Sequence, residues 1–279
     1  MNDRHVTTPT REVQIDGTTF AYRRWGRPGT VPVLLIPHFR AGMDHWDPLV
    51  TDSLALEREV ILFNGRGIAS SGGAPRDTIE EMADDIAAFL DAIGVPEVDA
   101  VGFSIGGMQV QELARRHPSR VRKTILLGTG SKTFARGTDP RVGELMAQPV
   151  IGADDYVFLF FGRSESARRA GLEFWERSHS RADQDPPSSA EVTAKQRPAV
   201  GAWRDSADAD DPFGYLREIA QPTLVVHGMD DAQIEPISAF ELATHLPDAQ
   251  LILYSDAGHG PHLQFPERFL VHATRFLDE

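Results

Sequence analysis

The chain of 279 residues contains no cysteine, and this absence removes several kinds of site at once. Disulfide frameworks, thiolate metal sites and cysteine nucleophiles all need that side chain, so none of them is available. Basic residues are scarce beside acidic ones: 28 lysines and arginines stand against 41 aspartates and glutamates, which gives a formal charge of −13. That balance argues against a nucleic-acid partner and against docking on anionic lipid, and it favours a small-molecule substrate.

Long apolar runs are missing too. No stretch approaches the length of a membrane span, and residues 1–11 are polar, without the apolar core of a signal peptide. We therefore expect a cytoplasmic protein without membrane contact, whose oligomeric state is left open between monomer and homodimer. The hydrophobic content of 41% is sufficient for a large core.

Short apolar runs of strand length alternate with helical patterns along most of the chain. The runs are residues 18–25, 31–37, 59–63, 98–103, 123–128, 222–227 and 250–254. Continuous stretches within them, such as residues 33–36 and 124–127, suit strands that are buried on both faces. Such alternation predicts an α/β fold with a mostly parallel central sheet of about eight strands, flanked by helices. The turn Asp16-Gly17 predicts an antiparallel hairpin at the sheet edge.

The alternation stops between residues 131 and 220, where no convincing strand occurs. Helical patterns fill this stretch instead, near residues 141–148, 154–161, 164–179 and 191–203. We interpret it as a helical cap inserted after the sixth strand, within a core formed by residues 1–130 and 221–279. Aromatic side chains of the cap suit the roof of a substrate pocket, and we expect the substrate to contact Phe160, Phe161 and Trp175.

The most informative motif is Gly102-Phe103-Ser104-Ile105-Gly106, which follows a buried strand and opens a helix over about residues 105–117. This layout is typical of a nucleophile elbow, in which a sharp turn exposes the serine and glycines on both sides leave room for the backbone that folds past it. Ser104 is the expected nucleophile. The backbone N–H of Ile105, at the start of the helix, is an expected oxyanion donor.

A serine nucleophile needs a base, and the base needs an acid that orients it. Two later strands end in Asp230-Asp231 and in Gly258-His259-Gly260, at the sheet edge where the serine also emerges. His259 is the expected base, because the flanking glycines let a loop present its ring. Either aspartate could orient it.

The order Ser104, Asp231, His259 resembles that of the α/β-hydrolase fold family, specifically its lid-bearing esterases, lactonases and cofactor-free haloperoxidases. The resemblance covers about residues 13–277 and includes the turn at residues 63–67. It implies Asp231 as the orienting acid in preference to Asp230, because Asp231 stands three residues after Gly228 in the family's Gly-x-x-Asp pattern. It also implies no cofactor.

The second oxyanion donor departs from the family pattern. In relatives the loop after the third strand begins His-Gly, whereas this chain reads His38-Phe39-Arg40 and lacks the glycine. Counting back from Trp46 places Phe39 at the donor position, and counting forward from His38 places Arg40 there. We prefer Phe39.

His262 forms a His-x-x-His pair with His259, but no carboxylate-rich ligand set accompanies the pair. We therefore expect no metal and place His262 in the substrate pocket or behind it. Together these residues predict a serine hydrolase that cleaves a small, mainly hydrophobic ester or lactone through an acyl-enzyme intermediate. Two alternatives fit the same residues: a lyase or cyclase that uses the triad for proton transfer, and a receptor that binds a small ligand.

Overall fold

The computed structural model describes residues 4–148 and 150–279, so residues 1–3 of the predicted core and residue 149 of the predicted cap lie outside the described residues. The strands are β1 Arg11–Ile15, β2 Thr18–Gly26, β3 Val33–Ile36, β4 Glu59–Phe63, β5 Val98–Phe103, β6 Val121–Leu127, β7 Thr223–Gly228 and β8 Ala249–Tyr254. The α-helices are α1 Pro48–Ala55, α2 Ile79–Ala92, α3 Ile105–Arg116, α4 Pro140–Ala147, α5 Ala153–Phe160, α6 Glu165–Ser178, α7 Ala190–Arg204, α8 Ile237–His245, α9 Pro261–Gln264 and α10 Pro266–Asp278. Within the described ranges, no helix is both long and apolar enough to span a membrane.

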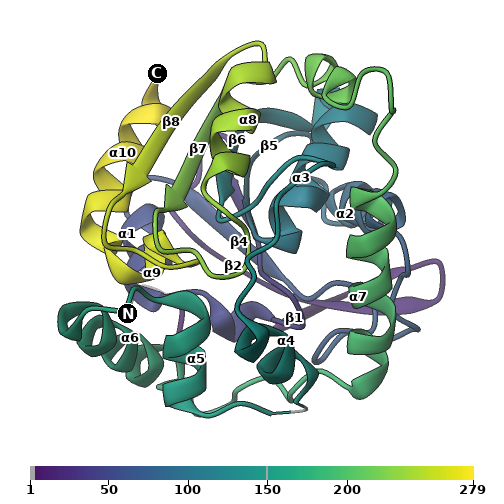
Figure 1. The fold of residues 1–279 in the computed structure, drawn as a ribbon. Helices are drawn as coiled ribbons and strands as arrows, with labels where there is room; N and C mark the ends of the chain where they lie inside the picture. Colours follow the sequence, from purple (N-terminus) through teal and green to yellow (C-terminus); the bar gives the residue numbers. More distant parts are fainter. Residues whose placement is uncertain (1–3, 149) are drawn as a thin grey trace.

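One sheet of eight strands, in the order β1-β2-β4-β3-β5-β6-β7-β8, runs through the molecule (Figure 1). β1 and β2 form an antiparallel hairpin at its edge, and the turn between them uses positive φ at Asp16 and Gly17. β2 also pairs antiparallel with β4, while the pairs from β3 to β8 are parallel. The predicted α/β fold with its mostly parallel sheet is confirmed.

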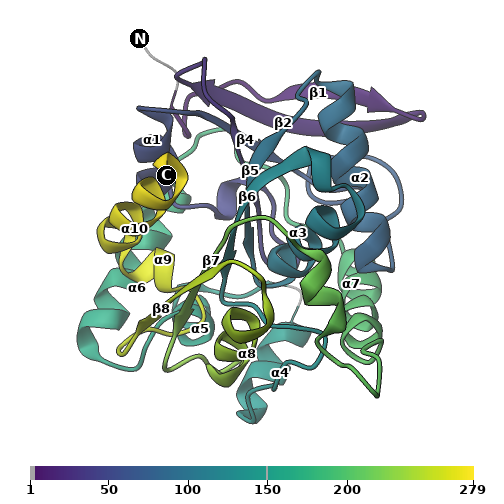
Figure 2. The same cartoon turned by 90° about the horizontal axis from the view of Figure 1, so that it is seen from above.

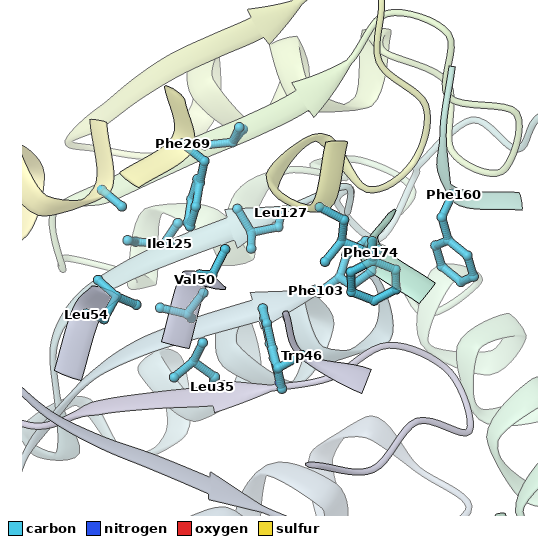
Figure 3. Close-up of a cluster of buried hydrophobic side chains, with 14 of the residues drawn as sticks. Leu35, Trp46, Val50, Leu54, Phe103, Ile125, Leu127, Phe160, Phe174 and Phe269 are labelled. Carbon is cyan, nitrogen blue, oxygen red and sulfur yellow. The ribbon is translucent and has the colours of Figure 1, made fainter. Parts of the chain in front are cut away.

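Alternate residues of the central strands belong to two separate hydrophobic cores, one on each face of the sheet. In β3, Val33 and Leu35 belong to one cluster and Leu34 and Ile36 to the other. α1 and α10 cover the first face, and α2, α3 and α8 cover the second (Figure 2). Figure 3 shows the first core, where sheet residues such as Leu35 meet side chains of α1 and α10. Because both faces are covered, the strands are apolar throughout.

Helices replace strands between β6 and β7, as the sequence predicts for residues 131–220. Over the described part of this stretch, the only β pairing is an isolated bridge between Arg136 and Ile234. α4, α5 and α6 lie together at one end of the sheet, whereas α7 lies beside α2 (Figure 1). Trp203 of α7 donates its Nε1–H to Glu112 of α3 at 2.8 Å, so α7 packs on the core helices.

Candidate active site

Ser104 occupies the sharp turn between β5 and α3. Its backbone has φ 56° and ψ −119°, a conformation that costs a residue with a side chain of the order of 1–3 kcal/mol. A Cβ on Gly102 would lie 2.4 Å from the carbonyl oxygen of Gly106, and a Cβ on Gly106 would lie 2.2 Å from that of Ile36. Both contacts are with backbone, so the turn requires glycine at both positions, as the motif predicts.

The loops after β7 and β8 bring Asp231 and His259 together. His259 Nδ1 lies 2.7 Å from Asp231 Oδ2, and both side chains are buried. The other carboxylate oxygen, Oδ1, accepts hydrogen bonds from the backbone N–H groups of Gln233 at 2.8 Å and Ile234 at 3.0 Å. Asp230 is exposed to solvent. Of the two adjacent aspartates, the one in contact with the histidine is therefore Asp231.

Asp231 remains ionised although it is buried. Burial by itself would raise the pKa of its carboxyl group, but the adjacent rings of His259 and His227 outweigh this effect and hold the pKa well below its usual range. The carboxylate can therefore orient the His259 ring and stabilise its protonated form.

The loop that carries His259 packs closely on the end of α5. Gly260 donates its N–H to the carbonyl oxygen of Phe160 at 2.7 Å, and a Cβ on Gly258 would lie 2.4 Å from the carbonyl oxygen of Phe161. His259 Nε2 is buried and has no hydrogen-bond partner among the residues that the structure describes. Ser104 and His259 therefore form no hydrogen bond with each other in this structure.

Ser104 opens into a cavity of about 280 Å³. One wall is apolar and comes from α4 to α6 and their connections: Leu145, Met146, Val150, Ile151, Tyr156, Leu159, Phe160, Phe174 and Trp175. The cavity is also lined by polar side chains, which include His38, Asp44, His45, Asp185 and Gln233. In the described ranges, no group of three or more histidine, aspartate or glutamate side chains is arranged to hold a metal ion.

The four predicted substrate-binding residues fall into two pairs. Phe160 and Trp175 line the cavity. Phe161 does not; it is 1% exposed and its ring packs 5.9 Å from that of Phe174. His262 also lies away from the cavity, fully buried among Trp46, Phe103 and Phe269, and burial lowers its pKa to about 3. The geometry therefore gives no support to substrate contact by Phe161 or His262, because both point into the core.

The two candidates for the second oxyanion donor differ in their hydrogen bonds. The backbone N–H of Arg40 donates to Gln196 Oε1 of α7 at 2.8 Å. The N–H groups of Phe39 and Ile105 make no hydrogen bond with any described residue. Phe39 and Ser104 both line the cavity. The arrangement leaves Phe39 and Ile105 able to donate to an oxyanion.

His38 and Tyr156 form a polar contact in the cavity wall that the sequence does not predict. His38 Nδ1 lies 3.1 Å from the carbonyl oxygen of Phe39, and its Nε2 lies 3.1 Å from the Tyr156 hydroxyl. Because a carbonyl can only accept, Nδ1 carries the proton and the tyrosine hydroxyl donates to Nε2. Burial holds the pKa of His38 well below its usual value. The partners are 118 residues apart, so no local signal links them.

Comparisons with known proteins agree with this fold. The profile of the alpha/beta hydrolase fold family matches residues 31–266. A pimeloyl-[acyl-carrier protein] methyl ester esterase of Aromatoleum aromaticum is 35% identical over 190 residues, which cover 64% of this chain and 75% of that protein. An alpha/beta hydrolase fold protein from Chitinophaga pinensis is 33% identical, with a TM-score of 0.90 over 99% of this chain and 100% of the other.

A further solved structure, Est816, described as an N-acyl homoserine lactone degrading enzyme, is 27% identical with a TM-score of 0.75, over 95% of this chain and 100% of that one. The profile match spans the nucleophile elbow and the loops of Asp231 and His259. The chain belongs to the alpha/beta hydrolase fold family.

Proposed function

We propose that this protein is a serine hydrolase that cleaves a small, mainly hydrophobic ester or lactone through an acyl-enzyme intermediate. Ser104 attacks the carbonyl carbon, His259 takes the serine proton and returns it to the leaving group, and Asp231 orients His259. Water then releases the acyl group. The observation that carries the proposal is the 2.7 Å contact between His259 Nδ1 and Asp231 Oδ2, beside a strained serine that faces a cavity.

Two backbone donors would stabilise the negative charge of the tetrahedral intermediate. Ile105 N–H stands at the first position of α3, where helix donors are unsatisfied and the helix dipole favours negative charge. Phe39 N–H is the second, since Arg40 N–H is held by Gln196. Each such donor contributes about 3 kcal/mol to lowering the barrier.

The relatives support the reaction class. Their names describe a methyl ester esterase, a 2-hydroxymuconate semialdehyde hydrolase and an N-acyl homoserine lactone degrading enzyme. The prediction that this chain is an enzyme of the ester-hydrolysing class is confirmed at that level. The particular substrate and the serine mechanism are our proposal.

The cavity supports a substrate with a compact apolar acyl group. A volume of about 280 Å³ is near the lower end of the range of small-molecule sites. Its apolar wall comes from α4, α5 and α6, within the proposed cap of residues 131–220. We assign the choice of substrate to these helices, because the proposed catalytic groups all lie outside them.

Active-site labelling tests the proposal. A fluorophosphonate should label the wild-type protein on Ser104, and the protein should turn over a nitrophenyl ester. Ser104→Ala should lose both while its melting temperature stays within a few degrees of wild type, because the serine contributes little packing. Labelling without turnover of any ester, lactone or amide would favour the lyase, cyclase or receptor alternatives. Turnover by folded Ser104→Ala would refute the mechanism.

A further inference from the structure

His227 is a second histidine in contact with Asp231. It is the penultimate residue of β7 and is fully buried. Its Nε2 lies 3.0 Å from Asp231 Oδ2 and 3.0 Å from the carbonyl oxygen of Ile234. It does not line the cavity, so it has no direct part in substrate binding.

The two neighbours of Nε2 fix the position of a proton on this ring. A carbonyl oxygen and an ionised carboxylate are both acceptors, so Nε2 must carry a hydrogen; a lone pair there would face two oxygens at 3.0 Å. The other ring nitrogen, Nδ1, has no hydrogen-bond partner among the described residues. A single proton, on Nε2, satisfies the contacts that the ring makes.

Four N–H groups therefore surround the Asp231 carboxylate. Gln233 and Ile234 donate to Oδ1, while His259 and His227 both approach Oδ2, at 2.7 and 3.0 Å. The His227 N–H also holds the carbonyl oxygen of Ile234, which closes the loop from residue 231 to residue 234 onto β7. The carboxylate oxygen that orients the proposed base is thus shared between two imidazoles.

We infer that His227 is a positioning residue: its Nε2–H holds the Asp231 loop in place and moderates the negative charge that Asp231 presents to His259. This inference rests on the proposed function. Loss of the His227 donor would leave a more basic Asp231 carboxylate, which favours the protonated form of His259. Since His259 must be unprotonated to accept the serine proton, activity would then require a higher pH.

Two further histidines, His38 and His262, interact electrostatically with His259, and burial lowers the pKa of both. Both stay uncharged at neutral pH and contribute no net charge to His259. We therefore expect the pH dependence of activity to respond to the contacts that Asp231 makes with the two histidines.

Kinetics as a function of pH test the inference. His227→Phe keeps an aromatic ring and removes the donor, whereas His227→Gln places an amide N–H near the position of Nε2. For a nitrophenyl ester, we expect His227→Phe to lower kcat by about tenfold, to leave KM within about twofold, and to raise the half-maximal pH of kcat by about one pH unit. His227→Gln should restore the wild-type midpoint.

His5→Phe is the matched control. His5 is also buried; among the described residues its side chain hydrogen-bonds to Thr51 and packs on Trp25, and it does not line the cavity. His5→Phe should lower the stability of the protein without changing the half-maximal pH of kcat. A midpoint unchanged in His227→Phe, or moved equally in His227→Gln, would overturn the inference and assign His227 a purely structural role.

One measurement needs no variant. A long-range ¹⁵N–¹H spectrum of the wild-type protein should show the His227 proton on Nε2, and a proton on Nδ1 alone would overturn the inference even if both variants failed to fold. The proposed function is tested separately. If Ser104→Ala retains turnover, the triad itself fails; if Ser104→Ala is inactive and the His227 variants behave as wild type, only the role of His227 fails.

Discussion

Replacing Asp231 with asparagine removes the charge and the acceptor that the proposed base requires, and it also changes the contact of the same oxygen with His227. Oδ1 of Asp231 accepts two backbone N–H groups, from Gln233 and Ile234, and the asparagine oxygen can keep both bonds. The amide nitrogen must then take the place of Oδ2, where it faces His259 Nδ1 at 2.7 Å. Two donors cannot share that contact, so the His259 proton moves to Nε2.

That proton is in the wrong place for catalysis. Nε2 is the atom that must accept the serine proton. A neutral ring that already carries its hydrogen on Nε2 has no lone pair there and cannot accept it. We expect kcat to fall about ten-thousand-fold, which corresponds to about 5.4 kcal/mol of lost transition-state stabilisation. Asp230→Asn changes an exposed side chain that does not contact His259, so its kcat should remain within about twofold of wild type.

Steady-state hydrolysis of a nitrophenyl ester measures both variants, with fluorophosphonate titration to count functional sites. Thermal melts establish that each variant is folded. Activity above about a tenth of wild type in Asp231→Asn would refute the orienting role. Equal losses in the two variants would show that net charge near the loop, rather than the contact with His259, controls the rate.

Two further predictions concern the cavity and the core. Phe160→Ala and Trp175→Ala should each shift the preference between short and long acyl esters, measured as kcat/KM, by about 1–3 kcal/mol, because both side chains line the cavity. Phe161→Ala should leave that preference unchanged and lower the free energy of unfolding by about 3–5 kcal/mol; an equal shift in preference would contradict its place in the core. Burial lowers the pKa of His262 to about 3, so the unfolded chain, with a pKa near 6.5 at this residue, binds more protons between these two values. His262 should therefore lower the free energy of unfolding by up to about 1.4 kcal/mol for each pH unit below 6.5. Urea unfolding at several pH values measures this, and the free energy of unfolding of His262→Phe should depend less on pH than that of wild type. The same pH dependence in both proteins would contradict the prediction.

The elbow could be predicted from the sequence because its signal is local: Gly102 and Gly106 stand two residues from Ser104. A Cβ on Gly102 would meet the backbone of Gly106 within the elbow itself, whereas a Cβ on Gly106 would meet the backbone of Ile36 at the end of β3. The same holds for the strands, whose apolar runs follow from burial on both faces. The preference for Asp231 over Asp230 came from the family spacing.

The meeting of Asp231 and His259 at the sheet edge could be predicted, but contacts that depend on how helices and loops pack could not. Phe160 and Phe161 are neighbours at the end of one helix, and the apolar pattern does not tell which faces the cavity. That depends on how α5 meets α6 and the loop of His259, which lies about a hundred residues away. The contacts of His38 with Tyr156 and of His227 with Asp231 depend in the same way on where the folded loops place their polar atoms.

The packing of the His259 loop on α5 limits how the helices over the cavity can be exchanged by recombination. Gly260 N–H depends on the carbonyl oxygen of Phe160, and Gly258 leaves just enough room for that of Phe161. A chimera that takes these helices from another protein could shift residues 160 and 161. The buried N–H of Gly260 would then lose its acceptor, or the backbone at residue 161 would collide with Gly258. The end of α5 and residues 258–260 therefore have to be transplanted as one unit, even though about a hundred residues separate them in the sequence.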